Sequence, residues 1–118
     1  MLPPPHFNEV TSQESLYLLG MLVFIHCIFD FAGQGTFLST AKNWNTPIPG
    51  VPWYLAMSIH VFMHAFPVLM MTGSMVCFML ELVSHFVIDA IKIEGRISFA
   101  TDQLLHISVK IVYVYLIL

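Results

Sequence analysis

Eight ionisable side chains stand in pairs, four residues apart, within long apolar stretches of the sequence. The pairs are His26 and Asp30, His60 and His64, His85 and Asp89, and Asp102 and His106. A spacing of four places both members of a pair on one face of an α-helix, one turn apart. Imidazole nitrogens and carboxylate oxygens are ligands that proteins use for Zn²⁺, Mn²⁺ and iron. We therefore expect these eight residues to bind a divalent metal, with Zn²⁺ favoured over Mn²⁺ or Fe.

The composition indicates where such helices would lie. The chain has 118 residues, of which 58% are hydrophobic and 9% charged, and its mean hydropathy is +0.81. Soluble domains typically carry about 25% charged residues, so this chain is too poor in charge to coat a globule in water. With a net charge of −3 and only 4 basic residues it cannot neutralise a run of phosphates, which excludes nucleic acid as a partner. We expect its surroundings to be a lipid bilayer.

Four apolar stretches are long enough to position the paired residues on membrane-crossing helices. They cover about residues 15–38, 53–71, 75–91 and 101–118. Proline, glycine and asparagine mark the breaks between them, and the run Pro3-Pro4-Pro5 favours an extended conformation. The sequence therefore predicts an all-α fold with two parts: an extended Pro-rich arm over residues 1–13 and a single four-helix transmembrane bundle over residues 14–118.

The basic residues of the predicted loops indicate the orientation of the bundle. Lys42 lies between the first two helices, and Lys92 and Arg96 lie between the last two. Because basic loops remain in the cytoplasm, both of these loops are expected inside and both termini outside.

The depth of residues in the membrane can be compared across each helical hairpin. Because one helix ascends as its antiparallel neighbour descends, two residues at equal depth have residue numbers that add to a constant. The pairs that satisfy this rule are His85 with His106, Asp89 with Asp102, His26 with His64, and Asp30 with His60. The rule predicts one layer of four histidines and a second layer of three aspartates with His60, in one pocket near the basic loops. Two facing carboxylates, Asp89 and Asp102, favour a cation between them. The alternative is that histidine and aspartate hydrogen-bond directly across the bundle, without a metal.

Further polar residues extend these faces. Gln34 follows Asp30 by one turn, and Gln103 adjoins Asp102, so both amides are expected either to orient ligands or to be ordinary interfacial polar groups.

Four charged residues complete the predicted set. Glu81 and Lys110 satisfy the same depth rule, which favours a buried ion pair. Lys42 and Lys92 would lie at the rim of the pocket, where they could hold an anionic group or simply serve as loop charges that set the topology.

Three ordered motifs carry a resemblance to a known family. They are H-xxx-DF-xx-Q from His26, H-xxx-D-xx-K from His85 and DQ-xx-H from Asp102. With His60 and His64 they resemble small membrane proteins of bacteria and phages known as domain of unknown function 3307, over about residues 16–118. The pattern is also distantly similar to the membrane-bound metal-dependent hydrolases. These resemblances imply a bacterial inner-membrane protein with a metal site and a hydrolytic role.

The residues and the resemblance together favour a metal-dependent hydrolase that acts on a lipid or a lipid-linked phosphate or ester. Asp30 or Asp102 would accept the proton from the attacking water. Two alternatives remain at this point: a metal-ion or proton pathway, and a phage-type effector that binds a host membrane protein, or a second copy of itself, without catalysis.

Overall fold

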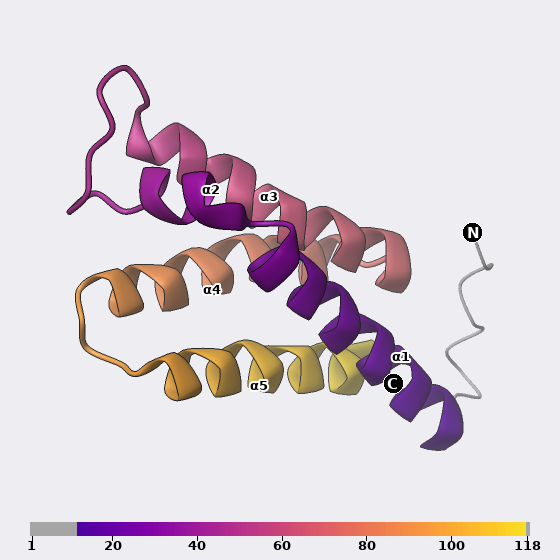
Figure 1. Cartoon of the computed structure of the whole chain (residues 1–118). Coiled ribbons are helices and arrows are strands. Elements are labelled where there is room, and N and C mark those ends of the chain that lie inside the picture. The colour runs from indigo at the N-terminus through magenta and orange to yellow at the C-terminus, as the bar shows by residue number, and fades with distance from the viewer. Residues whose placement is uncertain (1–11, 118) are drawn as a thin grey trace.

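The computed structural model describes residues 12–117 and shows an all-α chain, as the sequence predicts (Figure 1). Its elements are α1 (Ser12–Cys27), the π-helix η2 (Ile28–Ala32), α2 (Gly35–Ala41), α3 (Trp53–Thr72), α4 (Met75–Ile93) and α5 (Phe99–Ile117). The last three agree with the predicted helices to within two residues at each end. The predicted Pro-rich arm falls mostly on residues 1–11, which lie outside the described residues, and its last two residues already belong to α1.

The prediction of one continuous first helix over residues 15–38 is wrong. After Cys27 the chain continues as a π-helix, in which the N–H of Gly33 donates to the carbonyl of Ile28 at 2.7 Å. α2 then begins at Gly35, whose φ of 66° is accessible to glycine at little cost. The chain changes direction there, so α2 leaves the line of α1 (Figure 1). Apolar periodicity does not reveal such a break, because both segments are apolar.

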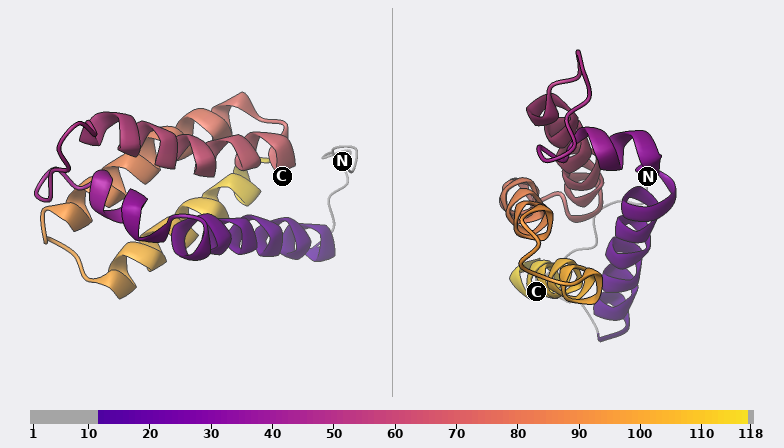
Figure 2. Two further views of the ribbon diagram at one scale, coloured as in Figure 1. Left: turned by 45° about the horizontal axis from the view of Figure 1, so that its top comes forward. Right: turned by 60° about the vertical axis from the view of Figure 1, so that its left-hand side comes forward.

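The four long helices form a closed bundle. The right-hand view of Figure 2, which looks along α4 and α5, shows a common interior surrounded by α1, α3, α4 and α5. α1 packs against both α3 and α5. α3 and α4 form a hairpin at Gly73, which has a φ of 65°, and the Ser74 hydroxyl caps α4 by accepting from the N–H of Cys77. The two longer loops meet at the opposite end, where Trp44 Nε1 donates to Glu94 Oε1 at 2.9 Å.

The interior of the bundle is divided into an apolar half and a polar half. Near the hairpin, an apolar core forms from Leu22, Val68, Cys77, Tyr113 and Val114. Towards the two longer loops, the buried side chains are mostly histidine, aspartate and lysine. Large apolar side chains cover the outside instead, with Tyr115 80% exposed and Leu16 69% exposed.

Among the described residues, two segments are long and apolar enough to cross a membrane. They are Gln13–Ala32, which includes η2, and Trp53–Thr72. α4 and α5 are each 19 residues long and carry more charged residues than α3, which has none: Glu81, Asp89 and Lys92 in α4, and Asp102 and Lys110 in α5.

The buried ion pair predicted between α4 and α5 is confirmed. Lys110 Nζ donates to both carboxylate oxygens of Glu81, at 2.6 and 2.8 Å, and Tyr113 adds a third bond at 2.8 Å. Glu81 is fully buried and Lys110 is 2% exposed. A charge in such a place is stable only with its partner, so this contact determines how α4 and α5 align.

Replacing either member alone should destabilise the bundle, because the remaining charge is left buried and unpaired. We expect Glu81→Ala or Lys110→Ala to lower the free energy of unfolding by about 3–5 kcal/mol. The double variant Glu81→Leu/Lys110→Met should recover most of this loss. Unfolding of the purified protein in mixed detergent micelles, followed by circular dichroism, measures the change, and strictly additive losses would contradict the pairing.

Candidate metal centre

Four imidazole rings pack against one another in the middle of the bundle, one from each long helix. Ring centroids lie 3.8 Å apart for His64 and His85, 4.2 Å for His85 and His106, 4.8 Å for His26 and His106, and 5.1 Å for His26 and His64. Each of the four residues is at most 2% exposed. The predicted layer of four histidines is therefore confirmed.

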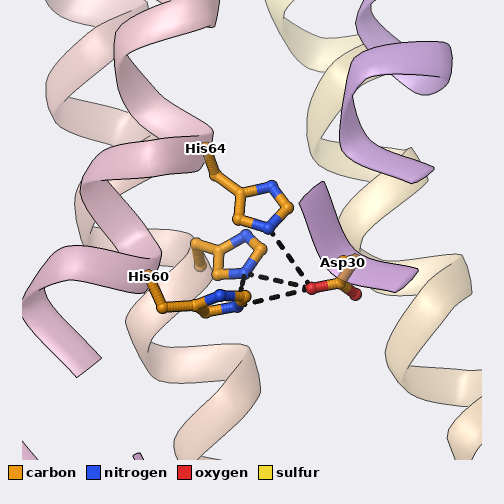
Figure 3. A group of neighbouring side chains, drawn as sticks. Asp30, His60 and His64 are labelled. Atoms are coloured by element: carbon orange, nitrogen blue, oxygen red, sulfur yellow. Dashed lines mark hydrogen bonds and ion pairs between the residues drawn. The ribbon is translucent and has the colours of Figure 1, made fainter. Parts of the chain in front are cut away.

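Asp30 faces three histidine side chains from two other helices. Its Oδ1 lies 3.4 Å from His60 Nε2, 3.3 Å from His64 Nε2 and 3.7 Å from His85 Nε2. Figure 3 shows His60 and His64 extending from α3 towards this carboxylate, which η2 presents. Ligand atoms around a tetrahedral Zn²⁺ lie about 3.3–3.6 Å from one another. The distances from Asp30 Oδ1 to the three nitrogens lie near this range, and one ligand atom of each of the four residues lies within 4.8 Å of the others.

Glu81 orients one of these histidines. Its Oε1 lies 3.2 Å from Nδ1 of His85, and a carboxylate only accepts, so Nδ1 carries the proton. The Nε2 atom of the same ring faces Asp30 and His60 Nε2, which is 3.1 Å away. A carboxylate behind the imidazole in this way is the usual support of a metal-binding histidine.

The side-chain amide of Gln103 connects three predicted site residues. Its Nε2 donates to Asp30 Oδ2 at 2.8 Å and to Asp102 Oδ2 at 2.9 Å, and its Oε1 lies 3.0 Å from His26 Nε2. Because the amide nitrogen faces two carboxylates, its oxygen must face His26, whose Nε2 therefore donates. Gln103 thus contacts three predicted site residues, and its role in orienting ligands stays a prediction. Gln34 differs, since within the described residues its amide donates only to the backbone carbonyl of Asp30, at 3.3 Å.

Asp89 and Asp102, which we expected to face each other and to favour a cation between them, each also have a lysine nearby. Lys42 Nζ donates to Asp89 Oδ2 at 2.6 Å, and Lys92 Nζ lies 3.5 Å from Asp102 Oδ2. Asp89 also contacts His106 Nε2 at 3.2 Å. Lys42, expected at the rim, is only 9% exposed, whereas the Lys92 side chain is 39% exposed. The turn after α2 directs Lys42 inward, and this turn depends on the break that the sequence does not predict.

Metal-ligating atoms gather in three overlapping groups within the described residues. The groups are Asp30, His60, His64 and His85; His26, His85 and His106; and Asp30, Asp102 and His106. Within each group the ligand atoms lie within 4.8 Å of one another. Seven of the eight predicted ligands are in these groups, and Asp89 contacts members of all three.

An open cavity of about 470 Å³ reaches the carboxylates of this cluster. Its polar lining consists of Asp30, Asp89, Asp102, Gln34, Gln103, Thr36, Ser39, Lys42 and Lys92. Phe31 and Phe99 form the apolar part of its wall, with ring centroids 5.8 Å apart. The carboxylates therefore face a space that a small polar group can enter, while the four imidazoles of the first layer do not line it.

Sequence reasoning missed two contributions to the site. Glu81 was expected only as the partner of Lys110, although its position one turn before His85 already places both on one helix face. Tyr113, which donates to Glu81, lies three residues after Lys110 and is fully buried. The three-residue spacing from Lys110 also places Tyr113 on the same helix face. An aromatic residue in an apolar stretch, however, gives no sign that its hydroxyl will bind a carboxylate.

The architecture and the buried cluster together define an all-α helical protein with a histidine and aspartate centre. Residues 18–118 match the family described as protein of unknown function, DUF3307, and the chain belongs to that family. No curated protein and no solved structure matches the chain.

The two glutamines offer a matched test of the amide contacts. Gln103→Met removes the bonds to Asp30, Asp102 and His26 while keeping the side-chain volume, so we expect a 10- to 100-fold weaker affinity for Zn²⁺. Gln34→Met removes one bond to the backbone and should leave the affinity within about twofold. Competition of the purified protein with a chromogenic zinc chelator measures both, and equal affinities in the two variants would contradict the role of Gln103.

Proposed function

We propose that this chain is a membrane-embedded, metal-dependent hydrolase that acts on a lipid or a lipid-linked phosphate or ester. The observation that carries the proposal is the convergence of His60, His64 and His85 on Asp30, next to a cavity lined by two lysines. Three imidazoles and one carboxylate favour Zn²⁺, with Mn²⁺ or Fe as alternatives.

Membrane insertion of all four long helices is part of this proposal. Four charged residues of α4 and α5 point inward, since Glu81, Asp89, Asp102 and Lys110 are each at most 4% exposed. The outward surface of α4 and α5 is apolar, with Val76 64% and Leu104 64% exposed. Soluble monomers seldom expose apolar surface on this scale, whereas lipid-facing helices do. These four charged residues of α4 and α5 would therefore not contact lipid.

The proposed topology places the basic loops in the cytoplasm and both termini outside, in a bacterial inner membrane. Both loops lie at one end of the bundle and contact each other, since Asn45 donates to the carbonyl of Ile93 (Figure 1). The tight turn between α3 and α4 lies at the other end. This arrangement supports a single cytoplasmic face, on the side of the polar half of the interior.

Cysteine labelling in bacterial cells tests this topology. With Cys27 and Cys77 replaced by alanine, a cysteine at exposed Pro47 should react with a membrane-impermeant maleimide only after the inner membrane is permeabilised. A cysteine at exposed Met75 should react in cells with only the outer membrane opened. The reverse pattern, or labelling of both positions without permeabilisation, would contradict the proposal.

Each site residue would have a separate role in hydrolysis: metal ligand, general base or binding of an anionic group. A divalent ion held by the cluster would polarise a phosphoryl or carbonyl oxygen and activate a water molecule. Asp102 suits the general base, because its buried Oδ1 makes no hydrogen bond within the described residues. Asp30 is already engaged by three imidazoles and Gln103, and it suits ligation. Lys92, which is partly exposed at the cavity, would hold an anionic group, and Lys42 would balance the charge of Asp89.

The interior of the bundle supports hydrolysis over an ion or proton pathway. Beyond the cluster and the Glu81 to Lys110 pair, the core around Leu22, Val68 and Val114 is apolar. A conducting path would need polar groups along the whole membrane thickness. The cavity ends at the cluster, which suits a substrate that enters and leaves by the same route.

Hydrolysis can be tested on the Zn²⁺-loaded protein in detergent with phosphatidic acid and p-nitrophenyl palmitate as probes. We expect metal-dependent release of phosphate or p-nitrophenol. His64→Ala should reduce it by at least about 100-fold, since losing the metal removes several kcal/mol of stabilisation, and Asp102→Asn by about 10²- to 10⁴-fold.

Ser58→Ala is the matched control, because Ser58 is exposed on the same helix as His64 and, within residues 12–117, its side chain bonds only to the backbone of Tyr54. Parent protein that releases neither product above the metal-free baseline would refute the proposed activity on these substrate classes.

A further inference from the structure

We propose that the cluster binds two metal ions and that Asp30 and Asp89 bridge them. The inference rests on the proposed metal site and extends it from one ion to two. Bridging carboxylates require one oxygen towards each ion, so the evidence lies in what each oxygen of these two residues faces. Two ions about 3.5–4 Å apart are a recurrent arrangement in enzymes that cleave phosphate esters and peptides.

Asp30 divides its two oxygens between two sides of the cluster. Oδ1 faces the nitrogens of His60 and His64, at 3.4 and 3.3 Å. Oδ2 faces the other side, 3.5 Å from His26 Nε2 and 2.8 Å from the amide nitrogen of Gln103. The carboxylate thus lies between the two histidines of α3 and the Gln103 amide of α5.

Asp89 divides its oxygens in the same manner, from the neighbouring helix α4. Oδ2 lies 3.2 Å from His60 Nε2 and 3.7 Å from His85 Nε2, and it also accepts from Lys42 Nζ at 2.6 Å. Oδ1 lies 3.2 Å from His106 Nε2. Two carboxylates therefore each present one oxygen to the histidines of α3 and the other to residues of α5.

The remaining ligands separate into the same two sets. His60, His64 and His85, with one oxygen of each bridging aspartate, form a set of five for the first ion. His106 and Asp102, whose Oδ1 is 3.5 Å from His106 Nε2, form the second set with the other two oxygens. The group that contains His64 and the group that contains Asp102 share only Asp30. With Asp89 the two groups comprise seven residues, which exceeds the four ligands that zinc usually takes and the six of octahedral Mn²⁺, so we assign them to two ions.

Asp102 provides an independent observation for the second ion. The residue is 1% exposed, and its buried Oδ1 has no hydrogen-bond partner in the described part of the chain. A buried carboxylate oxygen without a donor is costly, and a cation beside His106 removes that cost. Its Oδ2 is already bonded to Gln103, so Oδ1 is the oxygen directed at His106, and with the second ion bound Asp102 would act as a ligand instead of the general base assigned to it above.

Metal content and spin coupling of the purified full chain, loaded with Mn²⁺, test the inference. We expect two Mn²⁺ per chain by elemental analysis and an exchange-coupled pair by electron paramagnetic resonance. His64→Ala removes a ligand of the first set only, and Asp102→Asn removes one of the second set only. Each should retain one Mn²⁺ and lose the coupled signal, while the control Ser108→Ala, at an exposed position of α5, should keep two.

The outcomes separate this inference from the proposed activity. One Mn²⁺ per chain in the parent, or two without coupling, would overturn the paired site even if hydrolysis were observed. Two coupled ions without hydrolysis would leave the paired site standing and refute the hydrolase. If a variant fails to fold, as judged by circular dichroism and size-exclusion chromatography, the parent's stoichiometry and coupling still decide the question.

Discussion

Charge buried inside an apolar bundle must be matched by charge or by hydrogen bonds, and the whole structure depends on this constraint. An unpaired carboxylate or ammonium in such a place costs several kcal/mol. Glu81 meets the constraint with Lys110, and Asp89 meets it with Lys42. Each pair joins elements distant in sequence, so satisfying the charges also sets the arrangement of the helices.

The helix positions and the grouping of the site were predictable because both follow from simple periodicities. A spacing of four residues places His85 and Asp89 on one face, and antiparallel geometry places His85 level with His106. These relations need only the helical rise and the loop positions. The same reasoning anticipated the contact between Glu81 and Lys110.

The parts that could not be predicted depend on local backbone geometry. Nothing in the residues around Asp30 distinguishes a π-helix from an α-helix, since the difference is one hydrogen-bond register in an apolar stretch. The bend at Gly35 follows from it, and the inward position of Lys42 follows from the bend. Lys42 is therefore the partner of Asp89, although sequence spacing alone predicted that Lys42 would lie at the rim of the pocket.

The distribution of polarity also explains how one small chain can hold so many titratable groups. Apolar side chains cover the outside and a compact apolar core closes one end, so the polar half is confined to the end with the basic loops. The cavity opens at that end, among the carboxylates rather than the imidazoles. The histidines are thereby kept from water while the aspartates remain reachable.

The π-helix η2 sets how the residues before it and the residues after it are rotated relative to each other about the helix axis. Each residue advances an α-helix by about 100°, and the wide turn of η2 accommodates one residue more than an α-turn would. Asp30 lies within that turn, and Lys42 directly follows α2 beyond it. Deleting a single residue from η2 would rotate the two sides of the turn by about 100° relative to each other. The cluster could then keep Asp30 or Lys42 in place, but not both.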